Sequence, residues 1–332
     1  MDRLLPIYEK KKFGYINLKG DVVIEPKFDY GEDFYDEIAI AAKKDKYGYI
    51  NFQGEFVIEP IYDDIYNFVD GIAIVEKDEK KGCIDRNGKE IIEIKYDDIG
   101  IISHGYIPVM KDFKWGYFNK QGEKKIDFVF HDAYEFKNGL ALVQSGGKLG
   151  YIDQNGKNII PYKFDYASSF ENGLAAISFR GKYGYIDTKG EFVIKPKFSF
   201  ASDFNEGLAA VSLKDKWGYI NNEGDIEIEI KYDYAEEFYD SIATVAIGDK
   251  YGLIDKNGEI ILPINYENIG IVLENMVSIE ENEKWGIIDK KGQYIVKPIF
   301  DEISIVTDEI IRLELNNKIG YINKLGEYIK AI

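Results

Sequence analysis

Short apolar segments, rich in β-branched and aromatic residues, alternate with polar turns along the whole chain. Good examples are Leu208–Leu213, Trp217–Ile220 and, one copy earlier, Glu191–Ile194. Segments of this length and composition predict β-strands. We refer to these three kinds of segment as strands A, B and C, in the order in which they follow one another.

The polar segments between the strands predict how they are joined. Strand A reaches strand B through a short turn, Lys214–Lys216. Strand B ends in Asn/Asp-x-x-Gly, as in Asn221–Gly224, which fits a type I turn with glycine at positive φ and predicts an antiparallel pair. After strand C comes a connector such as Phe164–Phe170. Its apolar residues three apart predict one helical or 3₁₀ turn, with Asp165 as a cap.

This pattern repeats every 34 residues without insertion or deletion. Strand B has a glycine in all ten copies, a lysine two positions before it and a second glycine six positions after it. The residue directly before the first glycine is aromatic in seven copies, including all three tryptophans. A unit of this size cannot bury its apolar face alone, so stacking of neighbours is expected. The first glycines are Gly14, Gly48, Gly82, Gly116, Gly150, Gly184, Gly218, Gly252, Gly286 and Gly320.

The repeat resembles that of the WG-repeat family of bacterial proteins, also described as KWG repeats. The matching pattern is K-[WYF]-G-[YIL]-[IF]-[ND]-x-x-G-E-x-[VI]-I-x-P-x-[FY]-D-x-A-x-x-F-x-x-G-L-A, and residues 182–207 follow it closely. The resemblance covers essentially all of residues 1–332. It implies an all-β repeat protein and brings no catalytic residues to transfer. We expect a single array of ten units over residues 1–332, the last without its connector.

Proline positions predict how the units stack. Pro6 and Pro108 share a column of strand A, and strand C often ends in proline, as at Pro196. Because proline cannot donate to a ladder, strand B is predicted as the middle of a three-stranded sheet. Ten such units, with no strand left to clasp a ring, favour an open superhelical array over the alternative of a closed propeller-like ring. Lys330, in a column otherwise filled by Ile, Leu or Val, is interpreted as protecting the last edge.

Charge and composition narrow the classes of function. The net charge of −17 argues against nucleic acid and anionic membrane surfaces and favours at most a cationic partner. No apolar run reaches about 18 residues, and the first residues lack a signal-peptide pattern, so a cytoplasmic protein is expected. The single cysteine, Cys83, cannot form an internal disulfide.

The aromatic residue before the strand-B glycine has two interpretations. Spaced rings could stack on sugars, and hairpin-type cell-wall-binding repeats offer a loose likeness. Alternatively, each ring packs over the backbone of a neighbouring glycine and anchors the core between units. Because the column also accepts Lys81, Leu149 and Ile319, the core interpretation is favoured. The recurring lysine is predicted to be exposed, with its stem along an aromatic face.

Motifs that would carry chemistry are weak. Asp255–Gly258 and its counterparts match only the middle of an EF-hand loop, so they are predicted as turns. Gly146–Lys148 lacks the rest of a phosphate-binding loop, and Cys83 is predicted as a buried thiol. No catalytic residue, cofactor or metal is predicted.

Irregular copies supply one candidate patch. The third connector, Ile99–Tyr106, lacks the usual phenylalanine and contains His104 and Tyr106, and His131 lies in the next connector. We favour neutral variation of the loop sequence as the explanation for these irregular residues. The alternative is a partner-binding patch over residues 99–131. The sequence as a whole predicts a non-enzymatic, acidic scaffold that binds another protein over an extended surface. Binding of a glycan or cell-wall polymer is the alternative.

Overall fold

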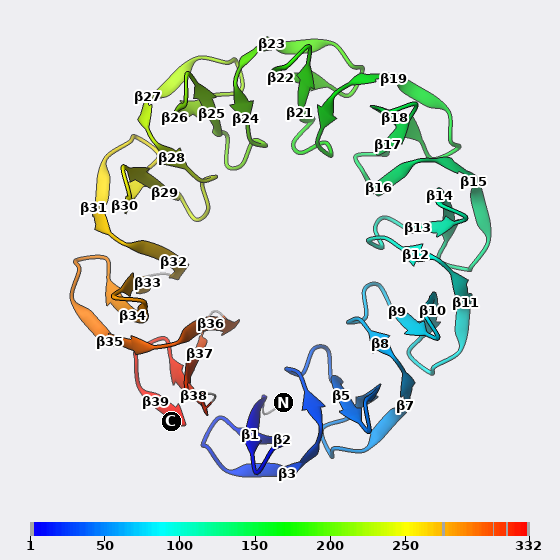
Figure 1. The fold of residues 1–332 in the computed structure, drawn as a ribbon, viewed down its shortest axis with the longest axis vertical. Coiled ribbons are helices and arrows are strands. Elements are labelled where there is room, and N and C mark those ends of the chain that lie inside the picture. The colour runs from blue at the N-terminus through cyan, green and yellow to red at the C-terminus, as the bar shows by residue number, and fades with distance from the viewer. Residues whose placement is uncertain (1–2, 274–275, 308, 317, 331–332) are drawn as a thin grey trace. The chain divides into compact units, whose positions relative to one another are not determined.

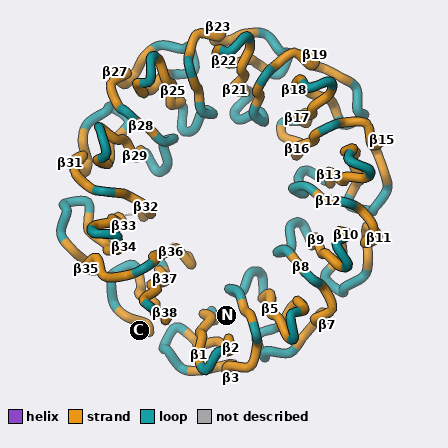
Figure 2. The backbone as a smooth tube through the Cα atoms, viewed as in Figure 1, coloured by secondary structure: helices purple, strands orange, loops and turns teal. Residues whose placement is uncertain are grey.

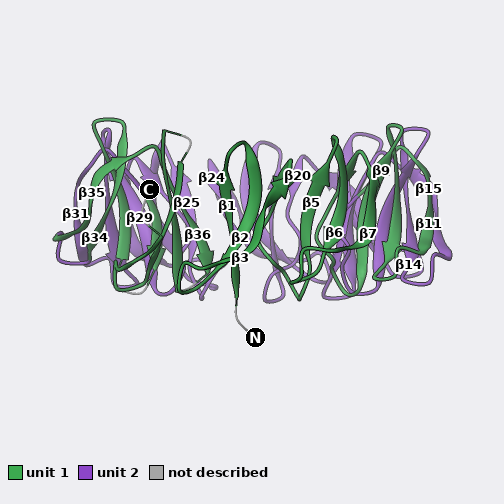
Figure 3. Cartoon of the chain, turned by 90° about the horizontal axis from the view of Figure 1, so that it is seen from below, with its two compact units in different colours: residues 1–99, 270–289, 293–332 green, residues 100–269, 290–292 purple. Residues whose placement is uncertain are grey.

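A computed structural model describes residues 3–273, 276–307, 309–316 and 318–330, so residues 1–2 and 331–332 of the predicted array lie outside the described part. The described residues form strands and turns, with no helix (Figure 2). None of them therefore belongs to a helix with the length and hydropathy of a membrane span. Contacts divide the chain into unit 1, residues 1–99, 270–289 and 293–332, and unit 2, residues 100–269 and 290–292 (Figure 3).

Each connector forms a strand, which corrects the predicted helical turn. The connector strand pairs with strand A of the following copy, so the strand order in a sheet is connector, A, B, C (Figure 1). We number the sheets 1 to 10 along the chain; sheets 2 to 10 have four strands, and sheet 1 has three among the described residues. The connector strands are β4 (Tyr30–Gly31), β8 (Asp64–Ile65), β12 (Asp98–Ile99), β16 (Asp132–Lys137), β20 (Tyr166–Ala167), β24 (Phe200–Ala201), β28 (Tyr234–Ala235), β32 (Asn268–Leu273) and β36 (Glu302–Thr307).

The three predicted strands are present in every copy, and the register runs antiparallel throughout. The A strands are β1 (Leu4–Glu9), β5 (Ala39–Lys43), β9 (Ile72–Lys77), β13 (Tyr106–Lys111), β17 (Leu140–Ser145), β21 (Leu174–Phe179), β25 (Ala209–Leu213), β29 (Ile242–Ile247), β33 (Met276–Glu281) and β37 (Ile310–Leu315). The B strands are β2 (Lys12–Asn17), β6 (Lys46–Ile50), β10 (Lys80–Asp85), β14 (Lys114–Asn119), β18 (Lys148–Asp153), β22 (Lys182–Asp187), β26 (Lys216–Ile220), β30 (Lys250–Asp255), β34 (Lys284–Asp289) and β38 (Lys318–Asn323). The C strands are β3 (Val22–Phe28), β7 (Phe56–Tyr62), β11 (Glu90–Tyr96), β15 (Lys124–Phe130), β19 (Asn158–Phe164), β23 (Phe192–Phe198), β27 (Ile226–Tyr232), β31 (Ile260–Tyr266), β35 (Tyr294–Phe300) and β39 (Tyr328–Lys330).

The predicted open superhelical array of three-stranded units is therefore wrong. Four-stranded antiparallel sheets that begin with a strand supplied by the preceding connector are the blades of a β-propeller, which was the alternative. Within unit 1, sheet 1 also packs against sheet 10. Leu5, Ile7 and Ile16 form one buried cluster with Ile310 and Tyr321. The first and last sheets thus cover each other's apolar faces, which an open array would leave exposed.

Strand C is an outer strand as predicted, but strand A is not. Pro196 lies inside β23, where the register against β22 shifts between Tyr183 and Tyr185. Because the regular hydrogen-bond ladder is interrupted at this bulge, the ladder does not require the backbone N–H that proline lacks. Pro108 lies in the inner strand β13, and its carbonyl accepts a hydrogen bond from Gly100 N at 2.9 Å. A Cβ on Gly100 would lie 3.1 Å from the Pro108 ring. Glycine at position 100 therefore leaves room for the proline ring on the neighbouring strand.

The predicted Asn/Asp-x-x-Gly turns are confirmed. In one of them the Asn221 carbonyl accepts from Gly224 N at 2.9 Å, its Oδ1 accepts from the N–H groups of Glu223 and Asp225, and Gly224 has a φ of 87°. Local hydrogen bonds and φ preferences are sufficient to specify this turn.

Gly218 of strand B is required by its neighbour in strand C. A Cβ on Gly218 would lie 2.6 Å from the carbonyl oxygen of Ile228. The backbones approach because strand C bulges here: Trp217 pairs with Tyr232, whereas Tyr219 pairs with Ile228. The glycine therefore makes room for the backbone of strand C, and its role does not depend on a ring packed over it.

Consecutive sheets within each unit are joined mainly by the residue after the glycine, which is usually tyrosine. Tyr151 is fully buried, and its ring lies 4.7 Å from that of Phe170 in the next connector. Its hydroxyl donates to the Ser168 carbonyl of the same connector at 2.6 Å. The same hydroxyl-to-carbonyl bond joins Tyr15 to Glu32, Tyr49 to Tyr66, Tyr117 to Tyr134, Tyr185 to Ser202 and Tyr219 to Glu236. The principal aromatic contact between sheets therefore comes from the residue after the glycine, not from the one before it.

Candidate binding surface

The structure divides the predicted patch of His104, Tyr106 and His131. His104 is exposed, has a φ of 48° in the turn that leads into β13, and its Nδ1 lies 2.7 Å from Ser103 Oγ. Tyr106 is half-buried at the start of β13, beside this turn. His131 is exposed before β16, and its N–H donates to the Gln144 carbonyl near the end of β17. Because a strand of six residues is about 17–20 Å long, His131 lies apart from the other two.

The missing phenylalanine of the third connector is replaced by Ile102. Ile102 is buried in the column that elsewhere contains Phe136, Phe170 and their equivalents. The irregular connector therefore keeps its apolar anchor, and what changes is the turn that carries His104.

A row of aromatic rings lies along the sheets of unit 2. It combines two columns, the residue before the strand-B glycine and the first residue of the connector strand, which alternate at steps of 17 residues. Neighbouring centroids in the first four rings are 5.5, 5.0 and 5.3 Å apart, and the last two rings are 6.1 Å apart. We call this set the aromatic row: Tyr166, Tyr183, Phe200, Trp217, Tyr234 and Tyr251.

The rings of the aromatic row are partly buried and partly exposed. Tyr166, Phe200 and Tyr234 expose 41%, 40% and 39% of their surface. The rings before the glycines are half-buried, and Trp217 packs against the buried cluster that contains Tyr219. Both interpretations of the pre-glycine aromatic residue were therefore incomplete. One side of the ring supports the core, and the rest belongs to the exposed surface of the row.

Ion pairs accompany the row, and sequence analysis missed them. Lys216 is exposed, as predicted, and forms an ion pair with Asp233 at 2.5 Å, and Asp233 also accepts from Gly248 N at 2.9 Å. The hydrogen bond from Lys216 holds the pKa of Asp233 below its usual range. The sequence signal was available, since lysine and aspartate recur 17 residues apart. The other pairs are Lys12–Asp29, Lys46–Asp63, Lys80–Asp97, Lys148–Asp165 and Lys284–Asp301.

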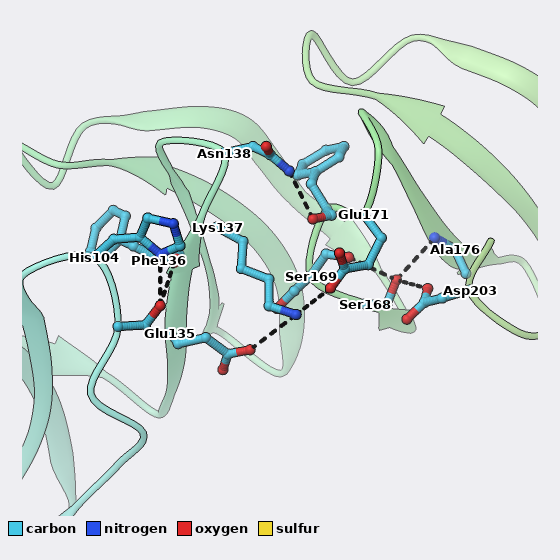
Figure 4. A network of polar contacts seen from close by, with 12 residues as sticks. His104, Glu135, Phe136, Lys137, Asn138, Ser168, Ser169, Glu171, Ala176 and Asp203 are labelled. Atoms are coloured by element: carbon cyan, nitrogen blue, oxygen red, sulfur yellow. Dashed lines mark hydrogen bonds and ion pairs between the residues drawn. The ribbon is translucent and has the colours of Figure 1, made fainter. Parts of the chain in front are cut away.

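The connectors of sheets 5 to 7 are linked in series by polar contacts (Figure 4). Asn138 donates to the Phe170 carbonyl at 2.9 Å, and Lys137 forms an ion pair with Glu171. Each contact runs from one connector to the next, so these loops hold one another in place. The repeat pattern does not predict this network, because the residues at these positions differ from copy to copy.

Asp203 is the most buried acid of this network. Its Oδ1 accepts from Ser168 Oγ at 2.5 Å, and the same Ser168 oxygen accepts from Ala176 N at 3.0 Å. Burial raises the pKa of Asp203, against the lowering effect of the Ser168 hydrogen bond. Burial and the charge of Asp203 also raise the pKa of Glu237 on the next connector.

The remaining candidates for chemistry occupy structural positions. Asp255 accepts from the N–H groups of Asn257 and Glu259, as a turn residue does. No group of three or more His, Cys, Asp or Glu residues among those that the structure describes is placed to hold a metal ion. Cys83 is buried, and burial raises the pKa of its thiol to about 12, which leaves it a poor nucleophile.

Comparison with known families decides the class of protein. A family model for the WG containing repeat matches nine successive segments: 13–47, 47–80, 82–115, 115–148, 150–183, 183–217, 217–251, 251–285 and 285–318. The chain belongs to the WG-repeat family. The resemblance noted from the Lys-aromatic-Gly pattern is thereby confirmed. No curated protein is significantly similar to this WG-repeat protein.

One solved structure supports the fold. A crystal structure of a eukaryotic initiation factor is similar with a TM-score of 0.59 and 9% identity, over 99% of this chain and 94% of that chain. The structure of Kluyveromyces lactis Hsv2p has a TM-score of 0.33 and 11% identity, over 78% of this chain and 91% of that one. The first similarity shows the fold alone, a β-propeller, in agreement with the four-stranded sheets.

Proposed function

We propose that this WG-repeat protein is a non-enzymatic scaffold that binds another protein through the aromatic row of unit 2. The observation that carries the proposal is a run of four rings in contact, from Tyr166 to Trp217, followed by the contacting pair Tyr234 and Tyr251. Three rings, each about two-fifths exposed, alternate with three half-buried rings over adjoining sheets. Large exposed apolar patches on a folded protein are typical of interaction sites, and aromatic residues are enriched at the centres of interfaces.

The chemistry of the partner follows from charge. The chain carries a net charge of −17, which favours a cationic partner at long range, although Asp165 and Asp233 beside the row are already paired with Lys148 and Lys216. The exposed faces of the aromatic rings attract lysine and arginine side chains. We therefore expect a partner segment that combines cationic and apolar side chains.

Ring geometry favours a protein over a glycan. Neighbouring rings of the row are tilted by 47°, 37° and 55° over the first four members, so they form no coplanar platform. A protein surface can fill such a tilted row with side chains of different shapes. Binding of a glycan or cell-wall polymer remains the alternative that the experiment separates.

The test uses the three exposed rings. The triple variant Tyr166→Ala, Phe200→Ala, Tyr234→Ala should lose the proteins that the parent captures from host extract, quantified by mass spectrometry. Tyr239→Ala is the matched control, because Tyr239 is 73% exposed but lies outside the row. Equal capture by parent and triple variant would contradict the proposal, and specific hits on a glycan array that the triple variant loses would support the alternative.

A further inference from the structure

An aspartate at the start of most connectors links two neighbouring sheets at the end where strands A and B are joined. Asp233 forms an ion pair with Lys216 of sheet 7, and it accepts a hydrogen bond at 2.9 Å from the N–H of Gly248, in the turn between β29 and β30 of sheet 8. One carboxylate therefore binds an ammonium group of one sheet and a turn N–H of the next. Asp29, Asp63 and Asp301 are bound in the same way.

His131 occupies this column in place of aspartate, between sheets 4 and 5. Lys114 is the counterpart of Lys216, and Gly146 is the counterpart of Gly248. Within the described part of the chain, Lys114 forms no ion pair and the N–H of Gly146 has no hydrogen-bond acceptor. An imidazole does not replace the carboxylate, because it lacks a pair of negatively charged oxygens. Two donors that share a carboxylate in other copies therefore receive none from this chain.

A second lysine adds positive charge at the same place. Lys111 pairs directly with Lys114 across β13 and β14, and it too forms no ion pair with any residue that the structure describes. Like charges at directly opposite positions of two strands repel each other. The sequence from Lys111 to Lys114 is Lys-Asp-Phe-Lys, so this turn has a net positive charge in a chain whose net charge is −17. A carboxylate from another molecule would relieve the repulsion and accept charge-assisted hydrogen bonds.

The same turn carries an exposed phenylalanine in a strained backbone conformation. Phe113 is 85% exposed, and its φ is 59°. Positive φ is unfavourable for a bulky side chain, and a ring in this position gains almost no burial from the fold. The other nine copies have glycine or a polar residue here, such as Glu79, Gly147 and Asp215. A ring that costs the fold stability and remains exposed is typical of a contact with another molecule.

We propose that the turn of Phe113 and the adjoining Lys114, His131 and Gly146 form a second binding surface, which takes a partner protein segment with a glutamate or aspartate among apolar residues. The partner carboxylate binds the Lys114 ammonium and the Gly146 N–H, in the manner that an aspartate of the chain does in other copies. The Phe113 ring packs against the apolar residues beside that carboxylate. Because Phe113 directly precedes Lys114, one short segment can reach both.

This surface is distinct from the aromatic row. It belongs to sheets 4 and 5, whereas the row begins with Tyr166 of sheet 6. The charge that it selects is also opposite, because lysines here favour an acidic segment and the row favours a cationic one. The proposal therefore does not rest on the proposed function.

The probe is a library of random peptides displayed on phage, selected on the full-length protein and counter-selected on the His131→Asp variant. In that variant the new carboxylate should bind Lys114 and Gly146, as in the other copies, so the fold is kept and the site is occupied. The selected peptides should contain an acidic residue among apolar ones. Fluorescence anisotropy of a labelled selected peptide should rise saturably with the parent protein. Replacing the acidic residue of the peptide by its amide should weaken binding about tenfold or more.

Protein variants separate this surface from the rest of the molecule. Phe113→Gly should weaken peptide binding about tenfold or more and yet raise the melting temperature, because glycine adopts positive φ without strain. Ser199→Asp, which adds a carboxylate in the same column but at another joint, is the matched control and should leave peptide binding unchanged. The aromatic-row triple variant should also still bind the peptide, so this proposal and the proposed function fail independently.

Three results would overturn the proposal. They are the absence of any peptide that prefers the parent over His131→Asp, selected peptides without an acidic residue, and equal binding of the peptide by the parent and Phe113→Gly. Both variants place at these positions a residue that other copies already have, so neither change should impair folding. Melting curves of each variant check this.

Discussion

The joint between sheets 6 and 7 and the joint between sheets 10 and 1 use the same tyrosine with different partners. Tyr185 donates to the Ser202 carbonyl in the connector of sheet 7 at 2.6 Å. Tyr321 donates to Pro6 in strand A of sheet 1. The first joint passes through a covalent connector, whereas the second joins segments more than 300 residues apart. The comparison shows that the tyrosine column can bind sheets together even where the chain does not connect them.

The second joint also contains an ion pair. Lys330 lies in a column that holds buried isoleucine in sheets such as sheet 6, where the residue is Ile194. Its Nζ lies 2.7 Å from Glu9 of sheet 1. β39 is the outer strand of sheet 10, so protection of this edge by Lys330 stays a prediction. This ion pair joins strand C of sheet 10 to strand A of sheet 1, whereas the ion pair between Lys137 and Glu171 joins two connectors.

The largest expected effect tests whether tyrosine carries the regular joint. Tyr185→Ala should lower the free energy of unfolding by about 3–5 kcal/mol, because the ring is fully buried. Tyr183→Ala, two residues earlier in β22, removes the same side chain from a half-buried position and should cost about 1–2 kcal/mol. Urea denaturation of both variants measures the difference, and equal losses would undo the distinction between the two columns.

A smaller change compares the hydroxyl bonds of the two joints. Tyr321→Phe should cost about 1–3 kcal/mol, because it leaves the Pro6 carbonyl without this donor in a buried place. Tyr185→Phe should cost about 1 kcal/mol, since its bond to Ser202 is only partly buried. The measurement is again chemical denaturation. A greater loss for Tyr185→Phe would contradict the view that the joint of sheets 10 and 1 depends more on its single phenol.

The next prediction concerns pH and the two equivalent acids. Burial raises the pKa of both Asp33 and Asp203 above the ordinary value of 3.8. The folded state therefore holds the proton more tightly, and stability falls as pH rises from 3.8 through the folded pKa. Asp33→Asn should gain stability relative to the parent over that window. Asp203→Asn should gain less, because Ser168 already donates to the ionised group. Melting temperatures between acid and neutral pH test this order.

The smallest effect is expected at the ion pairs. Lys216→Met should lower stability slightly at low salt, and the loss should vanish at high salt, because Lys216 and Asp233 are both partly exposed. The pKa of Asp233 is lowered, so the contribution of the pair exists above that pKa and disappears as pH falls through it. A loss that persists in high salt would show that the contact between Lys216 and Asp233 is worth more than a screened surface ion pair.

Sequence reasoning recovered the family and the strands but misjudged the connectors. The Phe164–Phe170 segment has apolar residues three apart, which also suits a short strand followed by a buried anchor. Tyr166 and Ala167 became a strand because Ser178 and Ile177 of the next copy were available to pair with them. Similarly, His104 and His131 lie in successive connectors, which suggested one patch. In the structure His104 lies before the start of β13, whereas His131 lies beside the end of β17. Their separation depends on pairing, which residue spacing alone does not reveal.

The sequence by itself determined the 34-residue period, the three strands of each copy and the Asx-x-x-Gly turns. These features depend on side-chain alternation and on hydrogen bonds within a few residues, as at Asn221 and Gly224. Tertiary structure alone decided that connectors complete the sheets, that Tyr321 donates to Pro6, and that Asp33 Oδ1 is buried without a hydrogen-bond partner in the described part of the chain. These outcomes depend on which distant groups come within hydrogen-bonding reach, and the residue pattern of a single repeat does not specify those partners.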